Sequence, residues 1–367
     1  MPHSRLHRLA DAGQSVWSDQ ISRSMLDSGE LERLVEDDAV SGVTSNPTIF
    51  AGAITSSSDY DDQLAEMAGR NADPVEIVAA LMGEDIRRAC DVLRPVWERS
   101  GGADGFVSVE VDPELARETE STVAEAREWV KRIDRPNLLV KVPATAEGIP
   151  AVRRLIGEGI SINVTLIFAI ERHRQVMDAY LAGLEDYAAI GGDPDRVASV
   201  ASFFVSRVDS EVDRRLDEIG SPEALALRGT AAVANARAAY DEFLLAFRGP
   251  RWEMLRALGA RVQRPLWAST STKDPSYRDT LYVDTLVAPH TVNTMPLSTI
   301  AAFQDHGPAP MPFGPEEIAD ARGSLARFSQ VGVDYDDVVR VLEEEGVDKF
   351  VASWRELLAD VERKAGV

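Results

Sequence analysis

Asn137-Leu-Leu-Val-Lys-Val-Pro143 is a short apolar run that one charged residue, Lys141, interrupts. Its length and its apolar content are typical of a strand that is buried on both faces. Side chains alternate along a strand, so Lys141 lies on the face opposite to Val140 and Val142. Burying an isolated charge is costly. The run therefore predicts a buried strand whose lysine has either a partner or a chemical role.

Seven further apolar runs resemble this one, and a longer segment of helical periodicity follows each. The eight runs lie near residues 15–19, 42–46, 105–111, 137–143, 160–166, 197–204, 264–270 and 290–295. Parallel strands need crossover helices, and eight such units close a barrel. The sequence thus predicts an α/β fold, a (β/α)8 TIM barrel. A doubly wound open sheet is the alternative, but the only glycine-rich run, Gly101-Gly-Ala-Asp-Gly105, precedes a strand instead of opening a helix.

The chain has 367 residues, enough for one large barrel with additions or for two average domains. No repeat or flexible linker marks a boundary, so we interpret residues 1–367 as a single domain. Two long intervals between strands predict helical insertions at about 69–100 and 209–260. The segment at about 314–364 predicts amphipathic helices with no strand between them, packed as an appendage that could cover the barrel mouth.

Acidic residues outnumber basic ones by 61 to 39, which gives a net charge of −22. This charge opposes binding to nucleic acid phosphates or anionic lipid. No stretch approaches a membrane span, and the first ten residues lack the apolar part of a signal peptide. Cys90 is the single cysteine, so no intramolecular disulfide can form. We expect a cytoplasmic monomer or homodimer that binds neither nucleic acid nor membrane.

Polar residues interrupt several of the predicted strands at alternate positions, where one face of each strand points to the barrel axis. In Phe106-Val-Ser-Val-Glu-Val-Asp112 the polar face carries Ser108, Glu110 and Asp112. The other candidates near the carboxyl ends of strands are Asp19, Thr44, Asn46, Asn163, Thr165, Ser202 and Phe204. Barrel active sites are built at this end. Taken singly, a strand Thr or Ser is usually structural, and Asn before Pro is also a typical turn former.

A buried lysine and a buried glutamate together point to chemistry, with a purely structural ion pair as the other interpretation. A lysine in a low-dielectric pocket gives up its ammonium form readily, so Lys141 can attack a carbonyl and form a Schiff base. The protonated imine draws electrons from the adjacent carbon–carbon bond and permits aldol chemistry without a metal. Glu110 and Thr165 can hold a water that relays protons, and Asp19 can take the proton of the hydroxyl at the cleaved bond.

The sequence offers no competing constellation. The five histidines show no metal-ligand spacing, and no serine-hydrolase elbow, Walker A loop or Cys/His pair occurs. We therefore expect neither a metal nor another cofactor.

Five segments in order resemble the transaldolase family, within the class I Schiff-base aldolases. They are Gly42-Val-Thr-Ser-Asn-Pro-Thr-Ile-Phe50, Ser108-Val-Glu-Val-Asp112, Leu139-Val-Lys-Val-Pro-Ala-Thr145, Ile162-Asn-Val-Thr-Leu-Ile-Phe168 and Ala201-Ser-Phe-Phe-Val-Ser-Arg-Val-Asp209. The resemblance extends from about residue 11 to 306 and is to the longer form of the enzyme. It implies a (β/α)8 barrel that transfers a dihydroxyacetone unit from sedoheptulose 7-phosphate or fructose 6-phosphate to an aldose phosphate, in the non-oxidative pentose phosphate pathway.

The resemblance also implies roles for single residues. Lys141 matches the Schiff-base lysine, Glu110 and Thr165 the residues that activate water, and Asp19 the acid/base. Residues that match the sugar-binding and phosphate-binding groups are Thr44, Asn46, Asn163, Ser202, Phe204, Arg207 and Ser269. The arginine that many relatives carry two residues after Ser269 is Ser271 here. We expect Lys273 to take the place of this arginine as a phosphate ligand, because a lysine can bind phosphate as a point charge.

Three other functions fit parts of the pattern. A fructose 6-phosphate aldolase-like enzyme, which releases free dihydroxyacetone, resembles the chain around Lys141. Glu110 and Phe204 favour transfer, because such aldolases resemble one another in having an uncharged residue and a tyrosine there. A catalytically silent barrel is disfavoured by the retained lysine and carboxylates. The third alternative is a metal-dependent aldolase, which loss of activity in a chelator would reveal.

Overall fold

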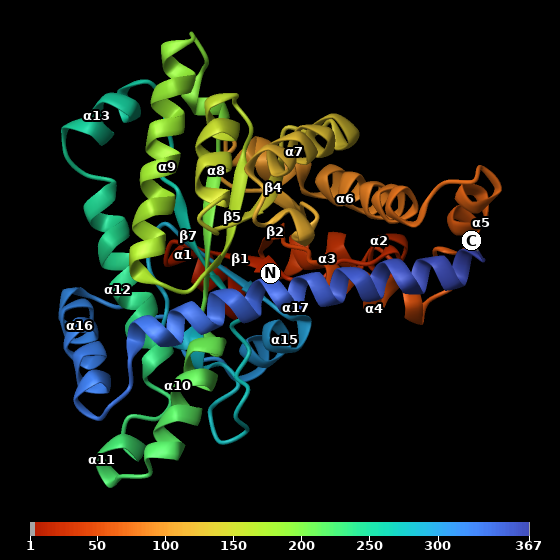
Figure 1. Cartoon of the computed structure of the whole chain (residues 1–367). Helices are drawn as coiled ribbons and strands as arrows, with labels where there is room; N and C mark the ends of the chain where they lie inside the picture. The colour runs from red at the N-terminus through yellow and green to blue at the C-terminus, as the bar shows by residue number, and fades with distance from the viewer. Residues whose placement is uncertain (1–3, 367) are drawn as a thin grey trace.

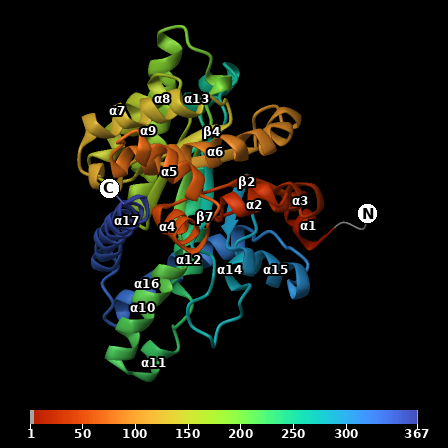
Figure 2. The same ribbon diagram turned by 90° about the vertical axis from the view of Figure 1, so that its right-hand side faces the viewer.

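The computed structural model describes residues 4–366, and its centre is a closed barrel of eight parallel strands in the order β1 to β8 (Figures 1 and 2). The strands are β1 (Gln14–Ser18), β2 (Val40–Val43), β3 (Phe106–Glu110), β4 (Leu138–Pro143), β5 (Ile162–Ile167), β6 (Ser199–Phe204), β7 (Arg264–Ala268) and β8 (Thr291–Met295). β8 pairs with β1 and closes the sheet. The predicted (β/α)8 barrel is confirmed, and the open sheet is wrong.

Helices surround the barrel and join successive strands (Figure 1). They are α1 (Arg5–Asp11), α2 (Arg23–Asp27), α3 (Glu30–Asp37), α4 (Pro47–Ser56), α5 (Asp61–Gly69), α6 (Pro74–Arg99), α7 (Thr119–Ile133), α8 (Gly148–Gly157), α9 (Ile170–Ala189), α10 (Ser206–Ile219), α11 (Pro222–Leu225), α12 (Ala231–Ala246), α13 (Pro250–Ala257), α14 (Leu281–Asp284), α15 (Leu297–His306), α16 (Pro315–Gln330) and α17 (Tyr335–Ala365). Within residues 4–366, no helix is both long and apolar enough to cross a bilayer.

Four strands end earlier than predicted, and each error concerns a site residue. β1 ends at Ser18 and β7 at Ala268, so Asp19 and Ser269 follow their strands. β2 ends at Val43, because the chain turns after it and the Asn46 side chain caps α4, where Pro47 is the first helical residue. Thr44 and Asn46 therefore follow the strand. β3 ends at Glu110, and Asp112 caps the short 3-10 helix Pro113–Leu115. Asp112 thus leaves the inward face that Ser108 and Glu110 share.

The helix α17 lies across the carboxyl-terminal end of the barrel, as its path in front of the strands shows (Figure 1). It packs against α4, α5, α6, α10 and the end of β5. The side chain of Asp334 caps its first turn, and Gly366 ends it in the left-handed conformation. Gly346 permits a close approach, since a Cβ there would lie 3.1 Å from Leu166 Cδ2. Of the predicted C-terminal helices, only α17 covers the mouth, because α16 packs on α12 outside the barrel.

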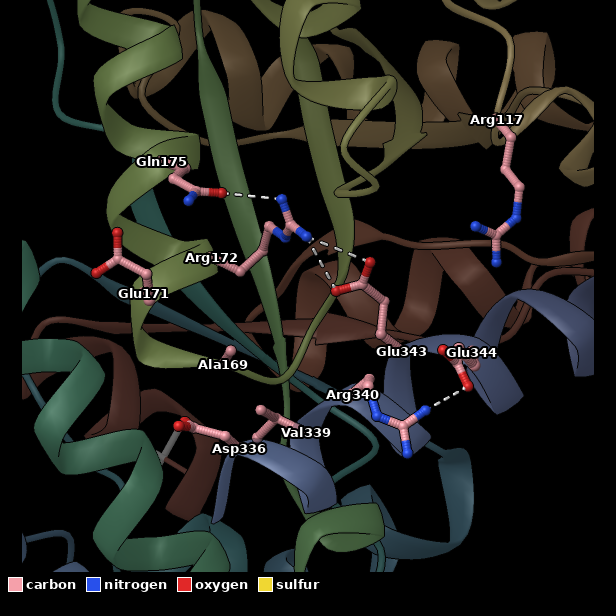
Figure 3. Close-up of a pocket in the computed structure, with 10 residues that line it drawn as sticks. All are labelled: Arg117, Ala169, Glu171, Arg172, Gln175, Asp336, Val339, Arg340, Glu343 and Glu344. Atoms are coloured by element: carbon pink, nitrogen blue, oxygen red, sulfur yellow. Dashed lines mark hydrogen bonds and ion pairs between the residues drawn. The ribbon is translucent and has the colours of Figure 1, made fainter. Parts of the chain in front are cut away.

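Ion pairs also join α17 to the segment after β3 and to the helices α9 and α10. Arg355 Nε lies 2.6 Å from Glu114 Oε1, and Arg215 Nη2 lies 2.8 Å from Asp337 Oδ2. Figure 3 shows Arg172 of α9 paired with Glu343 of α17. This pair lines a surface pocket of about 290 Å³ between α9 and α17, which contains none of the predicted site residues. The contacts hold α17 in one position over the barrel.

Candidate active site

Lys141 and Glu110 lie side by side on neighbouring strands, where the register of β3 and β4 pairs their Cα positions. The Lys141 Nζ atom lies 3.2 Å from Glu110 Oε2 and donates a hydrogen bond of 2.8 Å to the Ser45 carbonyl oxygen. Their side chains are only 7% and 1% exposed. The predicted buried pair is therefore present, with its amine at the level where β4 approaches its carboxyl end.

Two oxygens near this pair have unused hydrogen-bonding capacity. Glu110 Oε1 and Thr165 Oγ1 are buried and have no hydrogen-bond partner within the described part of the chain. Burial raises the pKa of Glu110, against the opposing effect of the Lys141 charge. Buried polar atoms are normally satisfied, by protein or by water. A carboxyl and a hydroxyl with free lone pairs beside an amine form an arrangement that can bind a water and pass protons.

Asp19 follows β1 and brings a second carboxyl group to the same mouth. Its backbone nitrogen donates to the Met295 carbonyl oxygen at 3.0 Å, which extends the pairing of β1 with β8 by one residue. Burial raises the pKa of Asp19 to about 6, although the charges of Lys273 and Lys141 act in the opposite direction. A carboxyl with this pKa exchanges protons near neutral pH and suits general acid/base catalysis.

A chain of hydrogen bonds fixes the polar side chains of β3, β5 and β6. Ser202 Oγ donates to Asn163 Oδ1 at 2.7 Å, and Asn163 Nδ2 donates to Ser108 Oγ at 3.0 Å. Asn163 is fully buried, so its amide orients Ser202 in this structure. Asn46 is both a helix cap and a pocket residue. Its Oδ1 atom accepts a hydrogen bond from Ile49 N at 3.1 Å, and the residue also lines the pocket.

These residues surround one pocket of about 150 Å³ at the carboxyl end of the barrel. Its lining residues are Asp19, Thr44, Asn46, Lys141, Thr165, Ser202, Phe204, Arg207, Ala268, Ser269, Thr294 and Phe350. Nine of them are predicted site residues; Glu110 and Asn163 lie buried behind the wall, and Lys273 lies outside the lining.

Three contributions to the pocket were missed from the sequence. Thr294 Oγ1 lies 2.8 Å from Thr44 Oγ1, and its position in the alternating run of β8 could have revealed it. Ser45 contributes only its carbonyl oxygen, which gives no residue-type signal. Phe350 comes from α17, and Lys141 Nζ lies 5.7 Å from the centre of its ring. No local pattern distinguishes Phe350 from the other apolar residues of that helix.

Arg207, the second residue of α10, supplies a positive charge to the pocket. Its Cζ atom lies 5.0 Å from the centre of the Phe204 ring, and its Nη1 atom is buried without a hydrogen-bond partner among residues 4–366. Burial lowers the pKa of this guanidinium, against the fields of Glu345 and Glu110. A buried guanidinium with an unused N–H is a binding group for an anion such as phosphate.

Ser269 and Lys273 belong to the loop after β7. Ser269 Oγ lies 2.9 Å from Ser206 Oγ, which ties this loop to the start of α10. Lys273 Nζ donates to Ser271 Oγ at 2.8 Å. Burial and the charge of Arg207 lower the pKa of Lys273, while Asp19 acts in the opposite direction. The lysine is therefore electrostatically coupled to both groups, although it is exposed and does not line the pocket.

The family of the chain follows from comparison with known proteins. The model of the transaldolase/fructose-6-phosphate aldolase family matches residues 16–361. The chain belongs to this family. The match begins in β1 and ends within α17, so it contains every strand that carries a pocket residue as well as the helix that covers the mouth.

Individual relatives agree with this result. A transaldolase of Parafrankia sp. (strain EAN1pec) is 55% identical over 361 residues, which cover 98% of each chain. Transaldolase 1 of Streptomyces coelicolor is 54% identical over 97% of this chain and 93% of its own length. The transaldolase of Mycobacterium ulcerans is 54% identical over 96% and 95%. The family resemblance inferred from the sequence segments is thereby confirmed.

Proposed function

We propose that this chain is a transaldolase. It moves a dihydroxyacetone unit from sedoheptulose 7-phosphate or fructose 6-phosphate to glyceraldehyde 3-phosphate or erythrose 4-phosphate, in the non-oxidative pentose phosphate pathway. The observation that carries the proposal is the buried contact of 3.2 Å between Lys141 Nζ and Glu110 Oε2, beneath a pocket that Asp19 and Arg207 line. The names of the full-length relatives support it.

The reaction begins when the Lys141 amine attacks the C2 carbonyl of the ketose. Loss of water from the adduct needs a proton, which Glu110 delivers through a water held with Thr165. Asp19 then accepts the proton of the C4 hydroxyl. The C3–C4 bond breaks, its electrons pass to the iminium, and the aldose leaves. The resulting enamine attacks the carbonyl of the acceptor aldose, Asp19 returns its proton, and hydrolysis of the imine releases the new ketose and the lysine.

The remaining residues bind the substrate. Arg207 receives the phosphate, because its buried guanidinium has an unused donor. Ser202 and Asn46 bind hydroxyls of the dihydroxyacetone unit, with Thr44 nearby and Asn163 behind them to fix Ser202. Phe204 supports Arg207 through its ring face. Ser269 helps to position the loop after β7 for phosphate binding, through its contact with Ser206.

Lys273→Met is expected to raise the KM for sugar phosphates roughly tenfold or more with a smaller change in kcat, because a charge-assisted contact contributes about 1.5 to 3 kcal/mol. Since the Lys273 charge also lowers the pKa of Asp19, the acid limb of the pH profile should move upward. Steady-state kinetics between pH 5 and 9 give both values. Arg278→Met removes an exposed cation from the same loop and serves as the control. Identical kinetics in the two variants would show that Lys273 does not bind the substrate phosphate.

We infer that α17 keeps water from the enamine. Phe350 is 5% exposed and forms the wall opposite to Lys141. Exclusion of water from a closed site protects a reactive intermediate from side reactions. Deleting α17 is an unsuitable test, because its apolar face belongs to the main hydrophobic core. A single truncation at Phe350 addresses the same question.

Phe350→Ala is expected to increase the ratio of free dihydroxyacetone to transferred product several-fold, because the cavity that it leaves admits water. Enzymatic measurement of dihydroxyacetone with and without erythrose 4-phosphate gives the ratio. Phe328→Ala removes an equally buried ring from α16, away from the mouth, and controls for loss of stability. Phe350→Leu should retain the wild-type ratio. A normal ratio in folded Phe350→Ala would contradict this role for α17.

The function itself is tested by incubation with fructose 6-phosphate and erythrose 4-phosphate. We expect glyceraldehyde 3-phosphate to form only when both sugars are present. The second candidate is a fructose 6-phosphate aldolase-like activity, which the description of the family includes. That activity would produce glyceraldehyde 3-phosphate and free dihydroxyacetone from fructose 6-phosphate alone, at a rate that the acceptor leaves unchanged.

We further propose that the chain acts as a single domain over residues 1–367, in the cytoplasm, as a monomer or homodimer, with sugar phosphates as its ligands and neither nucleic acid nor membrane as a partner. The contacts of α17 with helices of the barrel support the first point. The free, buried thiol of Cys90 is compatible with a reducing compartment.

A further inference from the structure

Two adjoining cavities lie at the amino-terminal end of the barrel, opposite to the active site. Their volumes are about 500 and about 180 Å³. Phe106, Leu138 and Ser199, which line them, are the first residues of β3, β4 and β6. Residues common to both cavities are Gly102, Phe106, Ala198 and Arg261. The shared residues make the two cavities neighbours, and together we call them the amino-end cavity. The larger one has the volume of a small-molecule site.

The glycine-rich loop Gly101–Gly105 forms a fixed wall of the amino-end cavity. Gly102 N donates to the Trp97 carbonyl oxygen at 2.8 Å, and Gly105 has a φ of +87°, with an added Cβ only 2.3 Å from Trp97 N. Asp104 accepts hydrogen bonds from Trp17 Nε1 at 2.8 Å and Ser41 Oγ at 2.9 Å. The loop is thus fastened to β1 and β2, and the wall is formed before any ligand arrives.

The cavity combines an apolar interior with positive charge. Its smaller part, about 180 Å³, which we call the inner part, is lined by apolar side chains that include Trp17, Phe106, Leu139 and Val262. Arg261, Arg264 and His290 also line it. Its outer part has three guanidinium groups and one carboxylate, namely Arg135, Arg196, Arg261 and Asp195.

Each outer arginine has a carboxylate partner, and only that of Arg196 is distant. Asp91, which pairs with Arg135, does not line it, while Arg261 pairs with the lining Asp195 and also donates to the Gly101 carbonyl oxygen. Arg196 is 81% exposed and only loosely paired, with its Nε atom 3.5 Å from Asp193 Oδ2. Arg196 is therefore the guanidinium with the most N–H groups left for an anion.

We propose that the amino-end cavity binds a small organic anion that has an apolar ring body and one acidic group, such as an aromatic carboxylate or sulfonate. The ring enters the inner part, where it displaces water from apolar and aromatic side chains. The acidic group stays in the outer part, where guanidinium N–H groups donate hydrogen bonds to planar or tetrahedral anions. Neither part resembles the sugar-phosphate pocket, whose lining is mainly polar. The ligand is therefore distinct from the substrates.

The test uses 1-anilinonaphthalene-8-sulfonate, a ring-bearing sulfonate whose fluorescence rises in an apolar site. We expect saturable binding to the folded enzyme with one site, unaffected by fructose 6-phosphate. Arg196→Glu should weaken binding roughly three- to tenfold, more at low salt. Ala198→Trp should weaken it more than tenfold, because Ala198 lines both cavities and the indole would occupy their volume. Arg256→Glu, an equal charge change at an exposed position of α13, is the control.

Transfer activity measured for each variant shows that the fold is intact, since none of the three residues belongs to the active site. The proposal is overturned by any of three results: no binding to the wild-type protein, equal binding to wild type and Ala198→Trp, or displacement of the probe by fructose 6-phosphate. Equal weakening in Arg196→Glu and Arg256→Glu would also overturn it, because the effect would then be one of net charge.

Discussion

Replacing Lys141 with methionine is expected to abolish transfer, with a loss in kcat of at least about 10⁴-fold, because removal of a covalent nucleophile eliminates the whole pathway that depends on it. Methionine keeps the length and the apolar stem of lysine, so the strand should still pack. It leaves the buried carboxyl group of Glu110 without its cation. Since burial already raises the pKa of Glu110, this group can remain protonated and avoid an unpaired charge.

Borohydride trapping identifies the nucleophile directly. Incubation of the wild-type protein with fructose 6-phosphate and borohydride should add the mass of one reduced dihydroxyacetone unit to the peptide that contains Lys141. The Lys141→Met protein should gain no mass, and Lys131→Met, which changes an 81% exposed lysine, should behave as wild type. A trapped adduct on another lysine, or transfer activity near normal in Lys141→Met, would refute the Schiff-base mechanism.

Replacing Asp19 with asparagine is expected to lower kcat by about 10² to 10⁴-fold, the usual contribution of a general acid/base. Cleavage requires the carboxylate form, because Asp19 must accept the proton of the C4 hydroxyl. With its pKa at about 6, the wild-type kcat/KM for the ketose should fall below that pH, by about tenfold per unit. The residual activity of Asp19→Asn should lack this limb. A pH profile from 5 to 9 measures both effects.

The same shift has a consequence for stability. The pKa of Asp19 is about 6 in the folded protein and 3.8 for an ordinary aspartate. Between these values the folded state binds more protons than the unfolded state, so the free energy of unfolding decreases as the pH rises through this window. Above pH 6 the charged carboxylate destabilises the fold. Asp19→Asn should therefore have a higher Tm than wild type at pH 8 and nearly the same Tm at pH 4.

A combined loss of activity and gain of stability separates a catalytic role from a structural one. Asp62→Asn changes an exposed carboxylate of α5 and should alter neither quantity. If Asp19→Asn retained full activity, or kept an acid limb near pH 6, the proton transfer would belong to another group.

Much of the fold was predictable from local patterns. The eight strands, their parallel direction and the inward position of Lys141, Glu110 and Thr165 follow from side-chain alternation and from the need for crossover helices. The contact between Lys141 and Glu110 follows almost as directly, because adjacent parallel strands place residues of the same layer beside each other. The errors at β2 and β3 arose where a helix cap competed with the strand pattern.

Other features of the site depend on residues that no local pattern connects. Asn163 matches a sugar-binding residue of the family, and its amide also bonds to Ser108 and Ser202, which no local pattern of the sequence predicts. The electrostatic coupling of Lys273 to Arg207 and Asp19 depends on how the loop after β7 packs against α10. Hydrogen-bond satisfaction is a property of the assembled barrel, and residue identity alone does not state it.

The sequence by itself determined the barrel and its buried lysine and glutamate. Backbone geometry fixes the period of each strand, and a charged residue within a buried apolar run is unusual. Only the tertiary structure decided that α17 covers the mouth, that Phe350 stands 5.7 Å from Lys141 Nζ, and that arginines gather at the opposite end of the barrel. These arrangements arise from packing between segments far apart in the chain. That packing free energy is spread over many apolar contacts, and the local sequence around each residue does not identify its partner.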